Sequence, residues 1–105
     1  MNYYLYVIEL HKDVGKIVKF RKKNPLFILG CRCFYVGQTA KSPIKRLQEH
    51  KKGYKSNTFA KIYGIKLIPA FYEKYNPIPT RKDAEELESY VAHKLRKEGY
   101  GVWFN

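Results

Sequence analysis

Hydrophobic and polar positions along the chain predict three short strands. Residues 3–10 form an apolar run rich in tyrosine, valine and isoleucine, which is typical of a strand. Residues 32–37 and 65–75 have a similar composition and predict two further strands. Pro69 lies inside the last run, and a proline there indicates an edge strand or a bulge because it has no N–H to donate.

Helical spacing fills the intervals between these strands. Residues 13–23 carry apolar positions at helical intervals, and Asn24-Pro25 ends the stretch. A second helix is expected from Ser42-Pro43, a cap followed by a first-turn proline, to about residue 52, where Gly53 closes it. A third, short helix is expected after a cap at Ser56 or Asn57, and it stops at Gly64. A fourth, long helix begins with a capping box of Thr80 and Asp83 and runs to about residue 97.

The order of these elements predicts one small α+β domain over residues 1–105. Strand, helix, strand, helix, helix, strand and helix follow one another without a linker, a repeat or a low-complexity tract. We expect a three-stranded, mostly antiparallel sheet flanked by helices. A chain of 105 residues has room for one modest core.

The charge balance indicates that the protein binds a partner. Lys and Arg number 21 against 9 Asp and Glu, which gives a net charge of +12. Such an excess favours a polyanionic partner, nucleic acid before an anionic membrane. A solvated basic surface without a specific partner is the alternative. The hydrophobic fraction of 45% excludes a disordered chain.

The cysteines and the apolar runs bear on the location of the protein. Cys31 and Cys33 are two residues apart, so a bridge between them would be strained, and no Cys-x-x-Cys spacing indicates zinc. No apolar stretch approaches the ~20 residues that span a bilayer. Glu9, His11 and Lys12 interrupt the first run, so no cleavable signal is evident. We expect a cytoplasmic protein with no membrane partner.

Glu88 is the first candidate for chemistry. On the long helix Ala84, Leu87, Val91 and Leu95 form one apolar stripe, and Glu88 falls at its edge, roughly 20° beyond Leu95 at ~100° per residue. A carboxylate held against a core needs a partner. Mg²⁺ or Mn²⁺ would suit it, because hard cations favour carboxylate oxygen. A salt bridge to a Lys or Arg is the alternative.

Two further pairs of residues carry suitable side chains. Arg46 and His50 are four apart and share a helix face, so a guanidinium that holds phosphate could lie beside an imidazole that orients or deprotonates a water or a phenol. Tyr6 and Tyr35 lie on predicted strands, where packing alone is the simpler interpretation. Gly37 would let backbone or a phosphate approach closely.

The order of these residues resembles the GIY-YIG nuclease family, whose name records two strand motifs. The segments that carry the resemblance are Tyr4-Leu5-Tyr6, Tyr35-Val36-Gly37, Gln38-Thr39, Arg46-x-x-x-His50 and Leu87-Glu88. It covers most of the chain. Two features depart from the family pattern, because Tyr4 replaces the first motif's glycine and 28 residues separate Tyr6 from Tyr35.

The resemblance implies roles for individual residues. Glu88 would bind one divalent metal, Mg²⁺ or Mn²⁺, and Arg46 would contact the scissile phosphate. Tyr6 and Tyr35 would be the motif tyrosines, with Tyr6 helping to activate the attacking water and His50 assisting that step. A terminal asparagine of the family site is matched by Asn105.

The long spacer between the tyrosines indicates a basic insertion at about residues 11–31, which could contact DNA or form a solvated helix. The predicted nucleic-acid contacts are Gly37, Gln38, Lys45, Arg46 and Lys51 around the site, and Lys19, Arg21 and Lys22 in the insertion. No helix-turn-helix or zinc-finger pattern is present, so we expect limited intrinsic specificity or a protein partner that supplies it.

Together these features predict a metal-dependent DNA endonuclease that hydrolyses phosphodiester bonds by in-line attack of water. Two alternatives stay open. The chain could be a catalytically inactive nucleic-acid-binding module of the same fold, with tyrosines that stack on bases. It could also be an interaction protein in a larger assembly.

Overall fold

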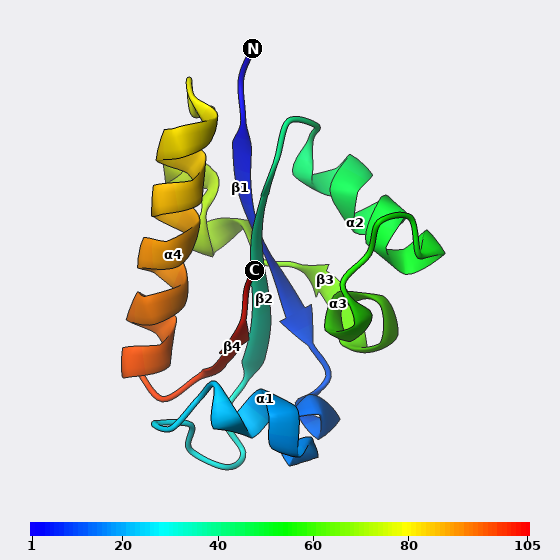
Figure 1. Cartoon of the computed structure of the whole chain (residues 1–105), viewed down its shortest axis with the longest axis vertical. Helices are drawn as coiled ribbons and strands as arrows, with labels where there is room; N and C mark the ends of the chain where they lie inside the picture. The colour runs from blue at the N-terminus through cyan, green and yellow to red at the C-terminus, as the bar shows by residue number, and fades with distance from the viewer.

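Helices cover both faces of a four-stranded sheet in the computed structural model, which describes all residues 1–105 (Figure 1). Figure 1 shows α4 on one face and α2 with α3 on the other. The strands are β1 (Tyr4–Leu10), β2 (Cys33–Thr39), β3 (Gly64–Leu67) and β4 (Gly101–Trp103), and the helices are α1 (Val18–Lys22), α2 (Pro43–Lys52), α3 (Thr58–Tyr63) and α4 (Arg81–Lys97).

The sheet has the strand order β3-β1-β2-β4. β1 runs antiparallel to both of its neighbours, whereas β4 runs parallel to β2. The predicted α+β class with a mostly antiparallel sheet is confirmed, but the number of strands is four rather than three. The strand that the sequence pattern does not predict is β4. It begins at Gly101 and has only three residues, too few for a periodic pattern of hydrophobic positions.

The third predicted strand is shorter than the apolar run that suggested it. β3 ends at Leu67, and residues 69–75 form two 3-10 turns, η2 (Pro69–Phe71) and η3 (Glu73–Tyr75). Pro69 starts the first turn, where its missing N–H costs no ladder hydrogen bond. β2 is longer than predicted and reaches Thr39.

The helix caps agree with the residues that predicted them. The Ser42 hydroxyl accepts a hydrogen bond from the Lys45 amide at the start of α2, and Gly53 ends that helix with a φ of 84°. The Thr80 side chain accepts from the Asp83 amide at the start of α4. These caps define the ends of the two helices that carry Arg46, His50 and Glu88. No helix combines the length and apolar composition needed to cross a membrane.

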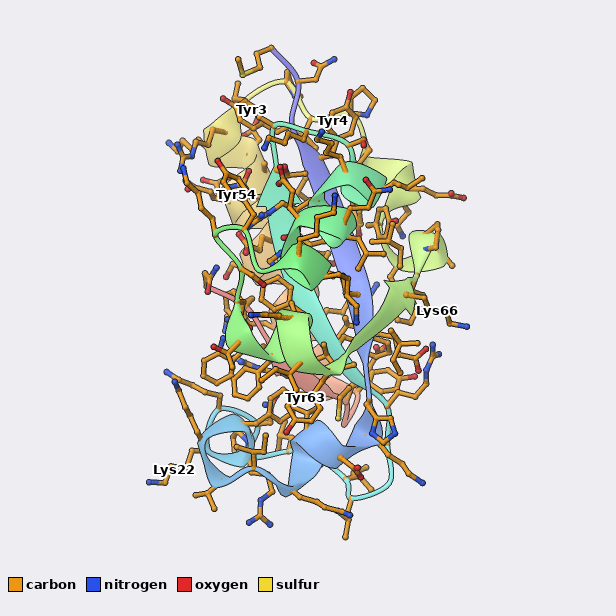
Figure 2. The ribbon with its side chains drawn as sticks, turned by 90° about the vertical axis from the view of Figure 1, so that its right-hand side faces the viewer. Tyr3, Tyr4, Lys22, Tyr54, Tyr63 and Lys66 are labelled. Atoms are coloured by element: carbon orange, nitrogen blue, oxygen red, sulfur yellow. The ribbon has the colours of Figure 1, made fainter.

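The basic segment after β1 is tied to the end of the sheet. It forms a 3-10 turn, η1 (Lys12–Lys16), and the single short helix α1, instead of one helix over residues 13–23. Phe20 is fully buried. The buried Asn24 side chain accepts from the Val102 amide at 2.8 Å and donates to the Phe20 carbonyl at 2.8 Å. In Figure 2, Lys22 projects from this end of the molecule, opposite Tyr3 and Tyr4.

Candidate active site

A pocket of about 410 Å³ opens where β2 continues past the end of β4. β4 pairs only with Cys33 to Tyr35, so the rest of β2 has β1 on one side and no strand on the other. The chain terminus, beside β2 in Figure 1, α4 and the Arg46 side chain of α2 complete the walls. The residues that line the pocket are Tyr6, Tyr35, Gly37, Gln38, Arg46, Arg81, Glu85, Glu88, Ser89, Phe104 and Asn105.

The pocket brings together side chains that are distant in the sequence. Five of the six predicted catalytic residues line it: Tyr6, Tyr35, Arg46, Glu88 and Asn105. The sixth, His50, is fully buried behind the Tyr6 hydroxyl. The arrangement therefore places a carboxylate, two phenols, a guanidinium and an amide around one small volume, with an imidazole as the inner neighbour of one phenol.

Glu88 is a buried carboxylate without a partner. The residue is 8% exposed, and its carboxylate forms no ion pair and no hydrogen bond within the chain. Burial, with a smaller effect from the Glu85 carboxylate, raises the pKa of Glu88 to about 7. The salt-bridge alternative for Glu88 is therefore absent from the structure. Glu88 lies within the buried face of α4, further from the edge than the helical periodicity suggested.

These surroundings fit a hard divalent cation. The potential donors around Glu88 are oxygen atoms, from the Tyr6 and Tyr35 hydroxyls and the Asn105 amide. No group of three or more His, Cys, Asp or Glu residues comes together to hold a metal. Glu85 also lines the pocket but is paired with Arg81, so Glu88 is the unpaired carboxylate. A single carboxylate ligand leaves most positions to water and phosphate, which is how Mg²⁺ is usually bound in phosphoryl-transfer sites. It does not fit zinc.

Tyr6 and His50 form a buried hydrogen-bonded pair. The Tyr6 Oη lies 2.9 Å from His50 Nε2. Burial, followed by the Arg46 charge, lowers the pKa of His50 to about 4, so the imidazole is neutral at physiological pH. Burial, reinforced by Tyr35, raises the pKa of Tyr6 above its usual value. Both groups are thus uncharged in the free protein.

Tyr35 is held by the chain terminus. The Asn105 Nδ2 donates to the Tyr35 Oη at 3.1 Å, and the Tyr35 and Tyr6 ring centroids are 6.2 Å apart. Burial, followed by the Glu88 charge, raises the pKa of Tyr35. Asn105 reaches the pocket because β4 runs parallel to β2 and carries the terminus along the β2 edge.

The Arg46 guanidinium is fixed by the loop that follows α2. Nη1 donates to the Glu49 carboxylate and to the Tyr54 carbonyl, both at 3.2 Å, and Nη2 donates to the Lys55 carbonyl at 2.8 Å. A guanidinium has more N–H donors than these three contacts use. Arg46 therefore presents a fixed positive charge with donors left for an anion in the pocket.

Gly37 is required by the Tyr6 ring. The two residues face each other across β1 and β2, and a Cβ on Gly37 would lie 2.5 Å from the Tyr6 Cζ and Oη. The space that we expected to admit backbone or a phosphate is thus partly filled by this phenol. Gly37 also lines the pocket.

We predict that Gly37→Ala displaces the Tyr6 phenol and disrupts the pocket. Tyr6 is buried at 1% exposure and its hydroxyl is bonded to His50, so displacement of the ring by the added methyl costs about 1–3 kcal/mol of stability. Thermal unfolding measures this loss. As a control, Gly30→Ala places a methyl in open space, although the φ of 95° at Gly30 adds some backbone strain. Equal stability of wild type and Gly37→Ala would contradict the packing described here.

The predicted nucleic-acid contacts divide into three groups. Gly37, Gln38 and Arg46 line the pocket. Outside it, Lys45 lines a neighbouring surface groove, and the Lys51 ammonium donates to the Gly64 carbonyl at 2.6 Å. The other contacts, on α1 at one end of the molecule, are Lys19, Arg21 and Lys22.

Four lining residues were not predicted from the sequence: Arg81, Glu85, Ser89 and Phe104. Arg81 and Glu85 form an ion pair of 3.5 Å at helical spacing. The signal for them existed, because Arg81, Glu85 and Ser89 are each four residues apart and share the α4 face beside Glu88. Phe104 could be found only through its neighbour Asn105.

Comparison with known proteins agrees with this geometry. The family model described as GIY-YIG catalytic domain matches residues 2–101, nearly the whole chain, which confirms the resemblance seen in the sequence. Members of this family are endonucleases and generally depend on a divalent metal, so nuclease-type activity is indicated at the level of the family. No curated protein and no solved structure matches the chain significantly.

Proposed function

We propose that this chain, which belongs to the GIY-YIG family, is a divalent-metal-dependent endonuclease that hydrolyses phosphodiester bonds in DNA. One observation carries the proposal. The buried, unpaired Glu88 carboxylate shares a pocket with the Arg46 guanidinium and with a phenol that has a hydrogen-bonded imidazole behind it. These are the groups that hydrolysis of a phosphodiester requires: an anion for the cation, a clamp for the phosphate and a path for a proton.

Glu88 would hold Mg²⁺ or Mn²⁺, with the phenol and amide oxygens of the pocket nearby. When bound, such an ion supplies Lewis-acid stabilisation of the charge that develops on phosphate and leaving oxygens. In the free protein the carboxyl group is half protonated near pH 7 because burial raises its pKa to about 7. Metal binding by Glu88 should therefore weaken as the pH falls below 7.

Tyr6 and His50 provide the proton path. A free phenolate is disfavoured because burial raises the pKa of Tyr6. As the attacking water gives its proton to the Tyr6 oxygen, the phenol can pass its own proton to His50 Nε2 at 2.9 Å. The hydroxide then forms a bond to phosphorus, the bond to the leaving oxygen breaks, and the imidazole carries the extra proton. The negative charge of the bound phosphate favours that imidazolium.

Arg46 clamps the phosphate that is attacked. Its side chain is 18% exposed, and its contacts with the carbonyls of Tyr54 and Lys55 hold the guanidinium before substrate arrives. A prepositioned cation stabilises the transition state because no reorganisation is needed as the charge builds up.

The basic charge extends the DNA surface beyond the pocket. The molecule measures 39 × 29 × 20 Å, so its long axis is close to one turn of duplex, about 34–36 Å. A duplex along that axis could touch both the pocket and α1. The basic residues of α1 would then contact phosphates away from the cut.

We predict that Lys22→Gln weakens DNA binding and reduces the salt slope of log K by about 1, as expected for the loss of one phosphate contact. Lys66→Gln is the matched control, because Lys66 lies on β3 at the opposite edge of the sheet from the pocket (Figure 2). Fluorescence anisotropy at several salt concentrations measures both slopes. A slope that falls equally in the two variants would show that α1 has no particular role.

Incubation of supercoiled plasmid with the protein tests the proposed function. We expect nicked circles with Mg²⁺ or Mn²⁺ and none with a chelator. A binding module of the same fold would give salt-sensitive, metal-independent binding without products. An interaction protein would bind DNA weakly and with little dependence on salt. Either of these two outcomes would contradict the proposed nuclease.

A further inference from the structure

Ser56 lies behind His50, outside the pocket and on the loop between α2 and α3. Its hydroxyl has three polar neighbours: His50 Nδ1 at 3.1 Å, the His50 carbonyl at 3.0 Å and the Asn57 carbonyl at 3.0 Å. Ser56 is half-buried, while His50 is fully buried. The serine therefore contacts the imidazole nitrogen that faces away from Tyr6.

The protons of this cluster can be counted. A serine hydroxyl has one proton, and a carbonyl oxygen can only accept. The Ser56 proton can point to only one neighbour at a time. Directed at Nδ1 it would leave both oxygen pairs at 3.0 Å without a proton, whereas directed at a carbonyl it leaves only one, so it points to a carbonyl oxygen. The oxygen lone pair of Ser56 is then left for His50 Nδ1, so Nδ1 carries the imidazole proton and donates.

The other imidazole nitrogen follows from this assignment. A neutral imidazole has one N–H, so a protonated Nδ1 leaves a lone pair on Nε2. Tyr6 is the neighbour of Nε2, at 2.9 Å, and its hydroxyl must donate to that lone pair. The proton of the phenol then points at His50, and its oxygen lone pairs are directed away from the imidazole.

We propose that Ser56 is a positioning residue that fixes the tautomer of His50 and thereby sets the direction of proton transfer from Tyr6. The catalytic consequence rests on the proposed nuclease function, whereas the tautomer itself does not. In the opposite tautomer Nε2–H would donate to the Tyr6 oxygen. Tyr6 could then no longer pass its proton to His50, and the path from the attacking water would be closed.

The imidazole nitrogens can be observed directly in ¹⁵N-histidine-labelled protein by long-range ¹H–¹⁵N correlation. The signals of His50 are identified by their loss in His50→Gln. We expect a protonated Nδ1 and an unprotonated Nε2 in the wild type above pH 6. Ser56→Ala should shift the population towards the Nε2–H form, and Ser56→Thr, which keeps the hydroxyl, should restore the wild-type pattern.

Nicking of plasmid DNA then tests the consequence. Ser56→Ala should reduce kcat by about tenfold at an unchanged KM, and Ser56→Thr should recover most of it. A wild-type spectrum with Nε2–H, or the same tautomer in wild type and Ser56→Ala, would overturn the proposal. So would a changed tautomer with unchanged kcat. If the wild type nicks no DNA, the nuclease function fails, while the spectra still decide the tautomer, and the wild-type spectrum does so even if Ser56→Ala fails to fold.

Discussion

Glu88→Gln is expected to lower the nicking rate by about 10²–10³-fold at saturating Mg²⁺, the range seen when a prepositioned electrostatic group is removed. Glutamine keeps the size of the side chain but not the negative charge that would hold the cation. DNA binding should be retained, because Arg46 and the basic surface are untouched. Rates of plasmid nicking and binding by anisotropy, measured on the same preparations, separate the two effects. A variant that nicks at the wild-type rate would remove Glu88 from the site.

The same substitution should stabilise the metal-free protein. Burial raises the pKa of Glu88 from 4.5 to about 7, so ionisation opposes folding wherever the carboxylate is charged in both states, above pH 7. The penalty is about 2 kcal/mol after allowance for solvent in the pocket, and it disappears as the pH falls from 7 to below 4.5, where both states hold the proton.

Denaturant unfolding at pH 8 and pH 4 measures this linkage. Glu88→Gln should be more stable than wild type at pH 8 and equal to it at pH 4. Glu86→Gln is the matched control, because Glu86 is exposed on the same helix and its change should stay within about 0.5 kcal/mol at both pH values. A destabilised Glu88→Gln at pH 8 would indicate that the carboxylate has a partner in the fold.

Tyr6→Phe is expected to lower kcat by about 10²–10⁴-fold, the usual contribution of general acid–base catalysis. The phenyl ring fills the same space opposite Gly37, so the pocket should keep its shape. Without the hydroxyl, neither the attacking water nor His50 Nε2 has its hydrogen-bond partner. The lost bond to the buried imidazole should also cost about 1–2 kcal/mol of stability. Single-turnover nicking and thermal unfolding test the two effects.

Tyr35→Phe is the matched control for that experiment. Tyr35 lines the same pocket, but its hydroxyl accepts from Asn105 and has no hydrogen bond to His50. The Tyr35 variant should therefore lose less activity than the Tyr6 variant. A larger loss of activity for Tyr35→Phe than for Tyr6→Phe would contradict the assignment of the proton path to Tyr6.

The identity of most site residues could be predicted from the sequence, but their burial and hydrogen bonds could not. Tyr6, Arg46 and Glu88 could be identified because their order along the chain resembles the family pattern, and capping residues such as Ser42 and Thr80 indicate where the helices begin. Glu88 is more buried than the apolar stripe predicts because the buried face of α4 includes Ala92 and is rotated past the stripe, away from Leu87. Helical periodicity gives a direction for a side chain but not the width of the surface that covers it.

Other features depend on pairing between distant segments. Asn105 meets Tyr35 only because β4 lies parallel to β2, a pairing that a strand of three residues does not signal. The sequence pattern indicates Ser56 only as a possible helix cap, whereas Asn57 caps α3 and Ser56 contacts His50. The sequence pattern predicts only the end of a helix at Asn24, yet the Asn24 side chain accepts from the Val102 amide and connects the basic segment to β4. Such hydrogen bonds depend on the assembled fold and have no local pattern.

The proposed nuclease depends on a single cation site shared by β1, β2 and α4. Iron-mediated cleavage of the polypeptide is the most direct test of that site. Fe²⁺ bound in place of Mg²⁺ cuts nearby backbone when ascorbate and peroxide are added, and the fragments identify the residues around the ion. We predict cuts beside Tyr6, Tyr35 and Glu88 that excess Mg²⁺ suppresses and that are absent from Glu88→Gln. Cuts at other places, or the same fragments from Glu88→Gln, would contradict a metal site in this pocket.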